Sequence, residues 1–78
     1  METLDAVSAE VQRARSKFPG NKHNLAALVE EVGELAKAFL KDEPHARIRA
    51  EAIQVACMAI RIAEEGDEAF DEKDWSIG

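Results

Sequence analysis

Hydrophobic residues recur at three- and four-residue steps through three segments of the chain, which is the spacing of amphipathic helices. The first helix is expected over 3–17, where the apolar positions are Leu4, Val7, Val11 and Ala14. Pro19 and Gly20 then break the pattern. The second helix is expected over 24–40, with Asn21 or Asn24 able to cap its first turn. Its apolar positions are Leu25, Leu28, Val29, Val32, Leu35, Ala36, Phe39 and Leu40.

The third helix is expected over 44–65, where Pro44 is tolerated in the first turn, Asp42 can cap it and Gly66 ends it. Between 50 and 63 this helix is apolar almost all round, so it has to be covered on more than one side. Two short helices do not easily provide that cover, whereas a second copy of the chain does. The pattern therefore predicts an all-α fold, a short three-helix bundle completed by dimerisation or tetramerisation.

One helical domain is expected over 1–66, followed by an acidic C-terminal tail over 67–78 whose only large apolar residues are Phe70 and Trp75. The 78 residues bury a modest core, and the single cysteine, Cys57, rules out an internal disulfide. Cys57 lies on an apolar helix and is expected to be a buried small residue. Self-association is the remaining support for a fold of this size.

The net charge is −6 and the isoelectric point is near 4.8, which argues against general binding to DNA or RNA. No apolar run approaches membrane-spanning length, and the acidic N-terminus does not resemble a signal peptide. The expected location is therefore the cytoplasm, with no membrane partner. A basic stretch with Arg13, Arg15, Lys17 and Lys22 is a candidate neighbour for phosphate groups, although ordinary surface charge explains it equally well.

Three glutamates, Glu30, Glu31 and Glu34, lie in the middle of the second helix. At about 100° per residue, Glu30 is expected to face water, while Glu31 and Glu34 share a face with small residues. Two carboxylates held three residues apart repel each other unless a cation or a proton intervenes. The alternative is a solvated acidic stripe paired with nearby lysines.

Glu51 strengthens the first interpretation, because it is a charge in the apolar stripe of the third helix, near Val55 and Met58. A buried carboxylate is costly unless it has a partner, which is either a basic residue such as Arg47 or a metal shared with Glu31 and Glu34. Gln54 lies three residues later and can offer a carbonyl oxygen or a hydrogen bond. A set of oxygen ligands suits Mg²⁺ or Mn²⁺ rather than zinc.

Residues 30–35, Glu-Glu-Val-Gly-Glu-Leu, followed by a helix that carries Glu51, resemble the MazG-like all-alpha nucleoside triphosphate pyrophosphohydrolases. Over roughly 18–66, the resemblance implies a fold built by self-association and cleavage of a ribo- or deoxyribonucleoside triphosphate to the monophosphate and pyrophosphate. It implies that Glu31, Glu34 and Glu51 are Mg²⁺ ligands, with Gln54 as a fourth position. It further implies Glu30 or Glu34 as the general base.

The same resemblance implies that the segment 17–24 contacts the nucleotide, with Lys22 and Asn24 as the contacts. Two departures from the family pattern favour a second reading. Gln54 stands where the family has Asp, and an acidic tail stands where fuller members have a further helix with basic side chains. The alternative function is a non-catalytic helical oligomerisation or nucleotide-binding module that has lost hydrolysis.

Overall fold

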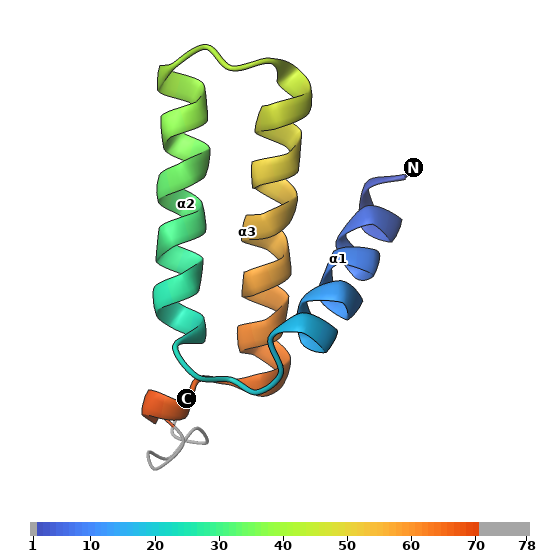
Figure 1. Cartoon of the computed structure of the whole chain (residues 1–78), viewed down its shortest axis with the longest axis vertical. Coiled ribbons are helices and arrows are strands. Elements are labelled where there is room, and N and C mark those ends of the chain that lie inside the picture. The colour runs from blue at the N-terminus through green and yellow to red at the C-terminus, as the bar shows by residue number, and fades with distance from the viewer. Residues whose placement is uncertain (1, 71–78) are drawn as a thin grey trace.

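The computed structural model describes residues 2–70, which form three α-helices and a final short turn of 3₁₀ helix. The helices are α1 (Thr3–Lys17), α2 (Asn24–Leu40) and α3 (His45–Glu65), and the 3₁₀ turn is η1 (Glu68–Phe70). Figure 1 shows α2 and α3 as a long antiparallel pair, with the shorter α1 crossing the lower part of α3. No strand occurs in residues 2–70, so the predicted all-α class is confirmed.

The connections between the helices follow from local backbone chemistry. Gly20 adopts a left-handed φ of 86° in the first loop, a conformation that glycine reaches without a side-chain clash. In the second loop the left-handed residue is Asp42, with φ 53°. The expectation that Asp42 caps α3 is wrong, because Pro44 precedes the helix and no side chain caps it. The predicted bounds of the first two helices are confirmed, and α3 starts one residue later than expected.

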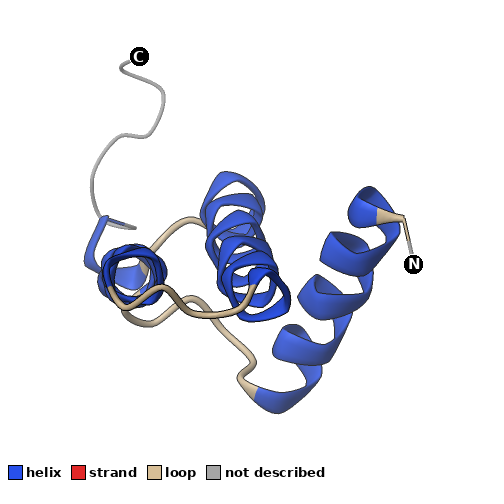
Figure 2. Cartoon of the chain, turned by 90° about the horizontal axis from the view of Figure 1, so that it is seen from above, coloured by secondary structure: helices blue, strands red, loops and turns tan. Residues whose placement is uncertain are grey.

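The central helix is α3, which lies between α1 and α2 when the molecule is viewed from above (Figure 2). The apolar core is small and sits between α1 and α3, where Val7, Val11 and Ala14 pack around Cys57. Cys57 is completely buried, as expected from its place on an apolar helix. Leu4 was expected in this core but is 74% exposed, because the N-terminal end of α1 diverges from α3 (Figure 1).

Most of the apolar stripe of α2 faces away from α3. Val29 is 64% exposed, Val32 47% and Phe39 61%, so the centre of this stripe is not covered by the other described helices of the chain. The side of α2 that turns towards α3 carries Leu28 and Leu35, which are half-buried. One row of α3 also remains open, at Ala52, Ala59 and Ala63. The single chain therefore leaves apolar surface uncovered on both long helices.

Asp67 caps the start of α2 from the far end of the described chain. Its carboxylate accepts hydrogen bonds from the Leu25 N–H at 2.6 Å and the Ala69 N–H at 2.8 Å. The residue before α2 is His23, in a left-handed conformation (φ 61°) whose side chain makes no cap hydrogen bond, and Asn24 is the first residue of the helix rather than its cap. Asp67, the first residue of the expected acidic tail, is only 2% exposed.

The rest of the acidic tail, including Trp75, lies outside the described residues. Within residues 2–70, no helix is both long enough and apolar enough to cross a membrane.

Candidate functional site

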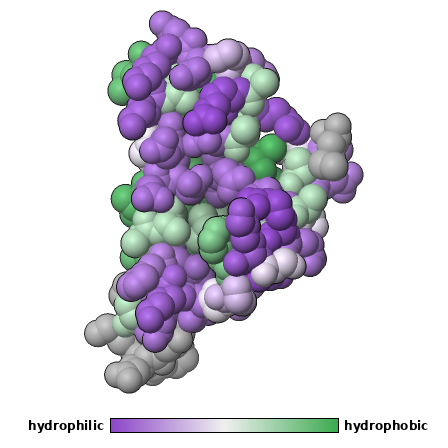
Figure 3. All heavy atoms as spheres, viewed as in Figure 1, coloured by the Kyte–Doolittle hydropathy of each residue, from purple (hydrophilic) through white to green (hydrophobic). Residues whose placement is uncertain are grey.

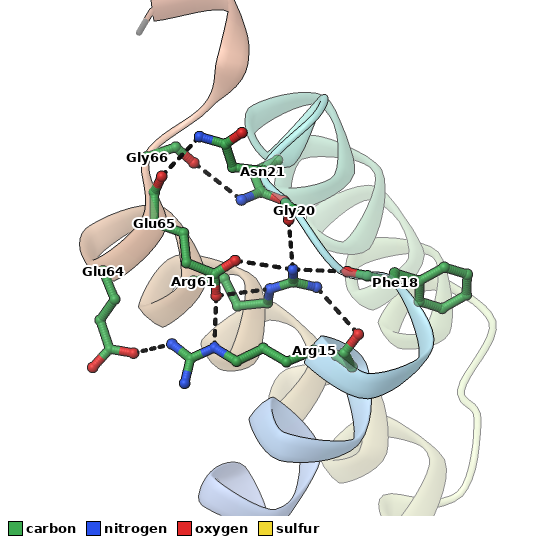
Figure 4. A network of polar contacts seen from close by, with 10 residues as sticks. Arg15, Phe18, Gly20, Asn21, Arg61, Glu64, Glu65 and Gly66 are labelled. Carbon is green, nitrogen blue, oxygen red and sulfur yellow. Dashed lines mark hydrogen bonds and ion pairs between the residues drawn. The ribbon is translucent and has the colours of Figure 1, made fainter.

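Arg61 holds the loop between α1 and α2 against the end of α3 (Figure 4). Its guanidinium donates to the carbonyl oxygens of Phe18 at 2.9 Å and Gly20 at 2.8 Å, and to both carboxylate oxygens of Glu65 at 3.0 and 3.1 Å. A longer bond of 3.5 Å reaches the carbonyl of Ala14 at the end of α1. Arg61 is 3% exposed, so this charge is buried, and its partners are the loop, the end of α1 and one carboxylate.

A second layer of polar contacts surrounds the Arg61 network. Arg15 donates to Glu65 at 2.7 Å and also pairs with Glu64. Asn21 of the loop and Asn24 at the start of α2 donate to backbone carbonyls at the end of α3: Asn21 to Glu65 at 2.8 Å and Asn24 to Gly66 at 3.0 Å. Together these contacts fix the loop 18–23 in one position relative to α2 and α3.

The fixed loop forms one wall of a cleft of about 530 Å³. The other lining residues come from the last part of α1, the first two turns of α2 and the second half of α3. Both signs of charge line the cleft. The basic side chains are Arg13, Lys22, His23 and Arg61, the acidic ones are Glu30 and Glu31, and the amides are Asn24 and Gln54. Segments that are far apart in the sequence therefore meet around a space large enough for a small ligand.

Glu10 links α1 to the edge of this cleft. Its carboxylate accepts a hydrogen bond from the Gln54 amide at 2.7 Å, and it also pairs with Arg13 on the next turn of α1. The hydrogen bond from Arg13 is the largest cause of a lowered pKa at Glu10, and the bond from Gln54 adds to it. Gln54 therefore uses one N–H of its amide to join α3 to α1, and its carbonyl oxygen and second N–H take no part in that bond.

Glu31 is the carboxylate whose surroundings disfavour its charge most clearly. Burial is the main cause of its raised pKa, and the nearby carboxylates of Glu51, Glu30, Glu34 and Glu10 raise it further. Carboxylates from all three helices therefore contribute to the raised pKa of Glu31. A bound cation would relieve this repulsion, since an opposite charge close by favours the ionised carboxylate.

Glu51 is largely enclosed. Its side chain is 13% exposed, and its carboxylate lies 3.9 Å from the Arg47 guanidinium, one turn earlier on α3. Arg47 is the basic residue that was predicted from the sequence as the partner of Glu51 in place of a metal. The distance is too long for a direct hydrogen bond, so the two groups form a loose ion pair whose Arg47 end is 57% exposed.

The predicted ligands have the right kinds of donor atom for a metal ion, but their positions do not form a metal site. The available atoms are carboxylate and amide oxygens, which suit Mg²⁺. Within residues 2–70, however, no three His, Cys, Asp or Glu side chains converge closely enough to hold a metal ion. A metal site built from Glu31, Glu34 and Glu51 would require these side chains to move towards one another.

The structure brings together five of the predicted site residues: Glu30, Glu31, Lys22, Asn24 and Gln54 all line the cleft. Glu30 is exposed there, as its position on the helix predicted. Two others lie elsewhere. Glu34 lines a separate shallow depression with Lys37, Lys41 and Arg47, and Glu51 lies between α2 and α3. Asn24 is 4% exposed, and one N–H of its side-chain amide donates to the Gly66 carbonyl, so this residue mainly ties the start of α2 to the end of α3.

Sequence reasoning did not select Glu10 or Arg61 for the site, and it named Arg13 only as part of the basic stretch that is a candidate neighbour for phosphate groups. Arg61 had a signal, since it is the only charge between 52 and 63 of a helix that is otherwise almost entirely apolar. Glu10 had none, because its contact with Gln54 spans 44 residues of sequence.

Comparisons with known protein families, with curated proteins and with solved structures find no match to this chain.

Proposed function

We propose that this protein is a Mg²⁺-dependent nucleoside triphosphate pyrophosphohydrolase of MazG-like type, which cleaves a ribo- or deoxyribonucleoside triphosphate to the monophosphate and pyrophosphate. One observation supports this above the others. The basic loop predicted to contact the nucleotide lines the same cleft as Glu30, Glu31 and Gln54, although 30 residues separate Gln54 from Asn24.

A polyphosphate needs positive charge from its site, and the cleft provides it on one side. Lys22 and His23 are exposed on the loop wall, and Arg13 is exposed on α1. Arg61 lies deeper, but its guanidinium is already engaged by Phe18, Gly20 and Glu65, so its contribution is to hold the loop. Lys22 and Arg13 are therefore the residues we assign to the phosphate groups.

The hydrolysis itself requires a water molecule to attack the α-phosphorus, while the bond between that phosphorus and the bridging oxygen to the β-phosphate breaks. Glu30 is exposed at the cleft and is assigned as the base that takes the proton from the water, with Glu34 as the alternative. Mg²⁺, when bound, neutralises the phosphate charge and orients the triphosphate. Glu31, Glu34 and Glu51, with the Gln54 carbonyl, are the oxygens assigned to hold it.

A second candidate function is a nucleotide-binding module without hydrolysis. Two observations favour it: three acidic side chains do not converge within residues 2–70, and the Gln54 amide is bonded to Glu10. In this reading the cleft binds phosphate through Lys22 and Arg13, while the carboxylates remain too far apart to assemble a metal centre. Binding of a nucleotide would then be independent of Mg²⁺.

Pyrophosphate release from a panel of ribo- and deoxyribonucleoside triphosphates with Mg²⁺ or Mn²⁺ tests the proposal directly. We expect release by the parent protein and loss of release in Glu30→Gln and Glu51→Gln. Asp5→Asn is the matched control, because Asp5 is an exposed acid on α1 outside the cleft. Nucleotide binding by the parent without any release would instead support the binding module.

Metal binding is measured separately by thermal melts with and without Mg²⁺, since a ligand that binds only the folded protein raises its melting temperature. Gln54→Asp restores the carboxylate of the family pattern, so we expect a larger Mg²⁺-dependent shift than in the parent. Gln54→Ala removes the same hydrogen bond to Glu10 without adding charge and serves as its control. Equal shifts in Gln54→Asp and Gln54→Ala would count against a metal at this position.

A further inference from the structure

The cleft shares a wall with a second hollow, the α1–α3 depression. This depression has a volume of about 370 Å³ and lies between α1 and the N-terminal half of α3. Hydrophobic atoms are visible in its region in Figure 3, between the upper part of α3 and α1. Arg13 and Gln54 line both hollows, whereas Glu10 lines only the depression. Glu10 therefore approaches the shared wall from outside the cleft.

The carboxylate of Glu10 binds both residues of the shared wall. It accepts a hydrogen bond from the Gln54 amide nitrogen at 2.7 Å and another from the Arg13 Nε at 3.0 Å. A terminal nitrogen of Arg13 completes a bidentate pair with the same carboxylate. The Glu10 side chain is 15% exposed, so little water competes for these bonds. The bond from Arg13 lowers the pKa of Glu10, which keeps the carboxylate ionised at neutral pH.

This carboxylate determines how the Gln54 amide is turned. A side-chain amide has a donor nitrogen at one end and an acceptor oxygen at the other, and its hydrogen-bond partners decide which end lies where. An ionised carboxylate only accepts hydrogen bonds, so it attracts the nitrogen and repels the oxygen. The nitrogen of Gln54 is therefore held against Glu10, and its oxygen is turned away from Glu10.

The direction of the amide decides what kind of ligand Gln54 serves. An oxygen that faces the cleft offers a lone pair to a metal ion, whereas a flipped amide would offer N–H groups to a phosphate oxygen. Arg13 remains a donor, because its second terminal nitrogen takes no part in the bidentate pair with Glu10. One carboxylate outside the cleft thus holds one acceptor and one donor of the shared wall.

We propose that Glu10 is a positioning residue, which turns the Gln54 carbonyl oxygen towards a cation in the cleft and keeps the Arg13 guanidinium beside the phosphate groups. The nature of these ligands rests on the proposed function, whereas the orientation of the amide does not. Glu10 does not line the cleft, so it acts through Arg13 and Gln54 and not by touching the ligand.

Nuclear magnetic resonance tests the orientation of the amide without any ligand. We expect the side-chain amide hydrogens of Gln54 to show through-space contacts with the Cγ hydrogens of Glu10. We also expect them to shift in Glu10→Gln, which keeps the size of the side chain and removes its charge. Asp5→Asn is the matched control, because Asp5 is an exposed acid on α1 that lines neither hollow. Amide signals that lack the contact, or that respond equally to both variants, overturn the proposal.

A double-mutant cycle tests whether Glu10 affects metal binding through Gln54. The rise in melting temperature with Mg²⁺ is measured for the parent, Glu10→Gln, Gln54→Asp and the double variant. Both carboxylate oxygens in Gln54→Asp can bind a metal, so that variant needs no orientation by Glu10. We expect Glu10→Gln to weaken Mg²⁺ binding about tenfold in the parent, which is the value of one hydrogen bond to a charged group, and to change it little in Gln54→Asp.

The two measurements separate failure of this proposal from failure of the proposed function. Equal weakening by Glu10→Gln in both backgrounds overturns the positioning role, because Glu10 would then act through its charge alone. A parent whose melting temperature does not change with Mg²⁺ overturns the cation and with it the proposed hydrolase. In that case the contact between Gln54 and Glu10 still decides the orientation of the amide.

Discussion

Replacing Arg61 by methionine is expected to destabilise the fold strongly and to loosen one wall of the cleft. Methionine is also unbranched and fills much of the same space, so the change removes the donors more than the volume. In the parent these donors reach Phe18, Gly20 and Glu65, and the residue itself is 3% exposed. The substitution leaves the two carbonyls and the carboxylate without their buried cation.

The magnitude follows from the number and kind of bonds lost. Removing one partner of a buried charged network costs about 3–5 kcal/mol. Water can replace part of it here, because Phe18 and Gly20 are exposed and the Glu65 side chain is 21% exposed, so the lower end of about 3 kcal/mol applies. A chain of this length has a total stability of about 4–12 kcal/mol. The loss is therefore a quarter or more of the whole.

The assay is thermal unfolding followed by circular dichroism. In a domain of 60–100 residues about 1 kcal/mol shifts the melting temperature by roughly 4–8 °C, so we expect a fall of roughly 12–24 °C. Arg15→Met is the matched control, because Arg15 also binds Glu65 but its side chain is 37% exposed. Its ion pairs are in contact with water and contribute much less. Arg61→Lys, which keeps the charge and loses the planar fork, should fall between the two.

Equal melting temperatures for Arg61→Met and Arg15→Met would refute the reasoning, since burial would then make no difference to the value of the bonds. A large loss in Arg61→Met that Arg61→Lys restores completely would refute a narrower part of it. In that case the charge alone, and not the fork that reaches two carbonyls at once, holds the loop. A nuclear magnetic resonance spectrum of each variant at a temperature where it is folded shows whether the changes spread beyond residues 18–24.

Three further predictions concern individual side chains. The raised pKa of Glu31 means that the folded state binds its proton more tightly than the unfolded state does. Ionisation of Glu31 therefore destabilises the fold as the pH rises above about 4.5. We expect Glu31→Gln to melt at a higher temperature than the parent at pH 7, with the difference shrinking below pH 4.5. The N–H groups of Leu25 and Ala69 lower the pKa of Asp67, so the stability that ionised Asp67 gives the fold is present above about pH 3.8 and is lost as the pH falls through the folded-state pKa. We expect Asp67→Asn to melt at a lower temperature than the parent at pH 7 and to approach the parent in acid. A difference that does not change with pH would contradict the charge effect. Cys57→Ser buries a hydroxyl among Val7 and Val11 and should cost about 1–3 kcal/mol in a urea titration, more than the apolar control Cys57→Ala if polarity and not size is decisive.

Much of the local structure was determined by the order of residues alone. The helices begin and end within one residue of where the three- and four-residue apolar spacing, Pro19, Gly20 and Gly66 place them. Those signals act over one or two turns, through backbone sterics and helix hydrogen bonds, so neighbouring residues are sufficient to specify them. The exposure of Glu30 and the burial of Cys57 followed from the same periodicity.

The candidate site could be predicted only in part. Glu30, Glu31, Lys22, Asn24 and Gln54 were selected from the sequence and do line one cleft. The helical wheel predicts that Glu31 and Glu34 share one face of α2. It does not predict how far along the helix axis each residue lies from the rest of the cleft. As a result, Glu34 lies outside the cleft, one turn beyond its lining residues.

Tertiary structure alone decided which face of α2 is buried and which side chains hold the cleft together. A wheel shows that Val32 and Phe39 share a stripe, but it does not show whether a helix of the same chain covers that stripe, and α3 packs against a different side. The contacts of Arg61 with Phe18, of Gln54 with Glu10 and of Asp67 with Leu25 each join residues more than 40 positions apart. Local sequence rules cannot find such pairs, because they depend on how the folded helices cross, whereas helix bounds depend on residues only a few positions apart.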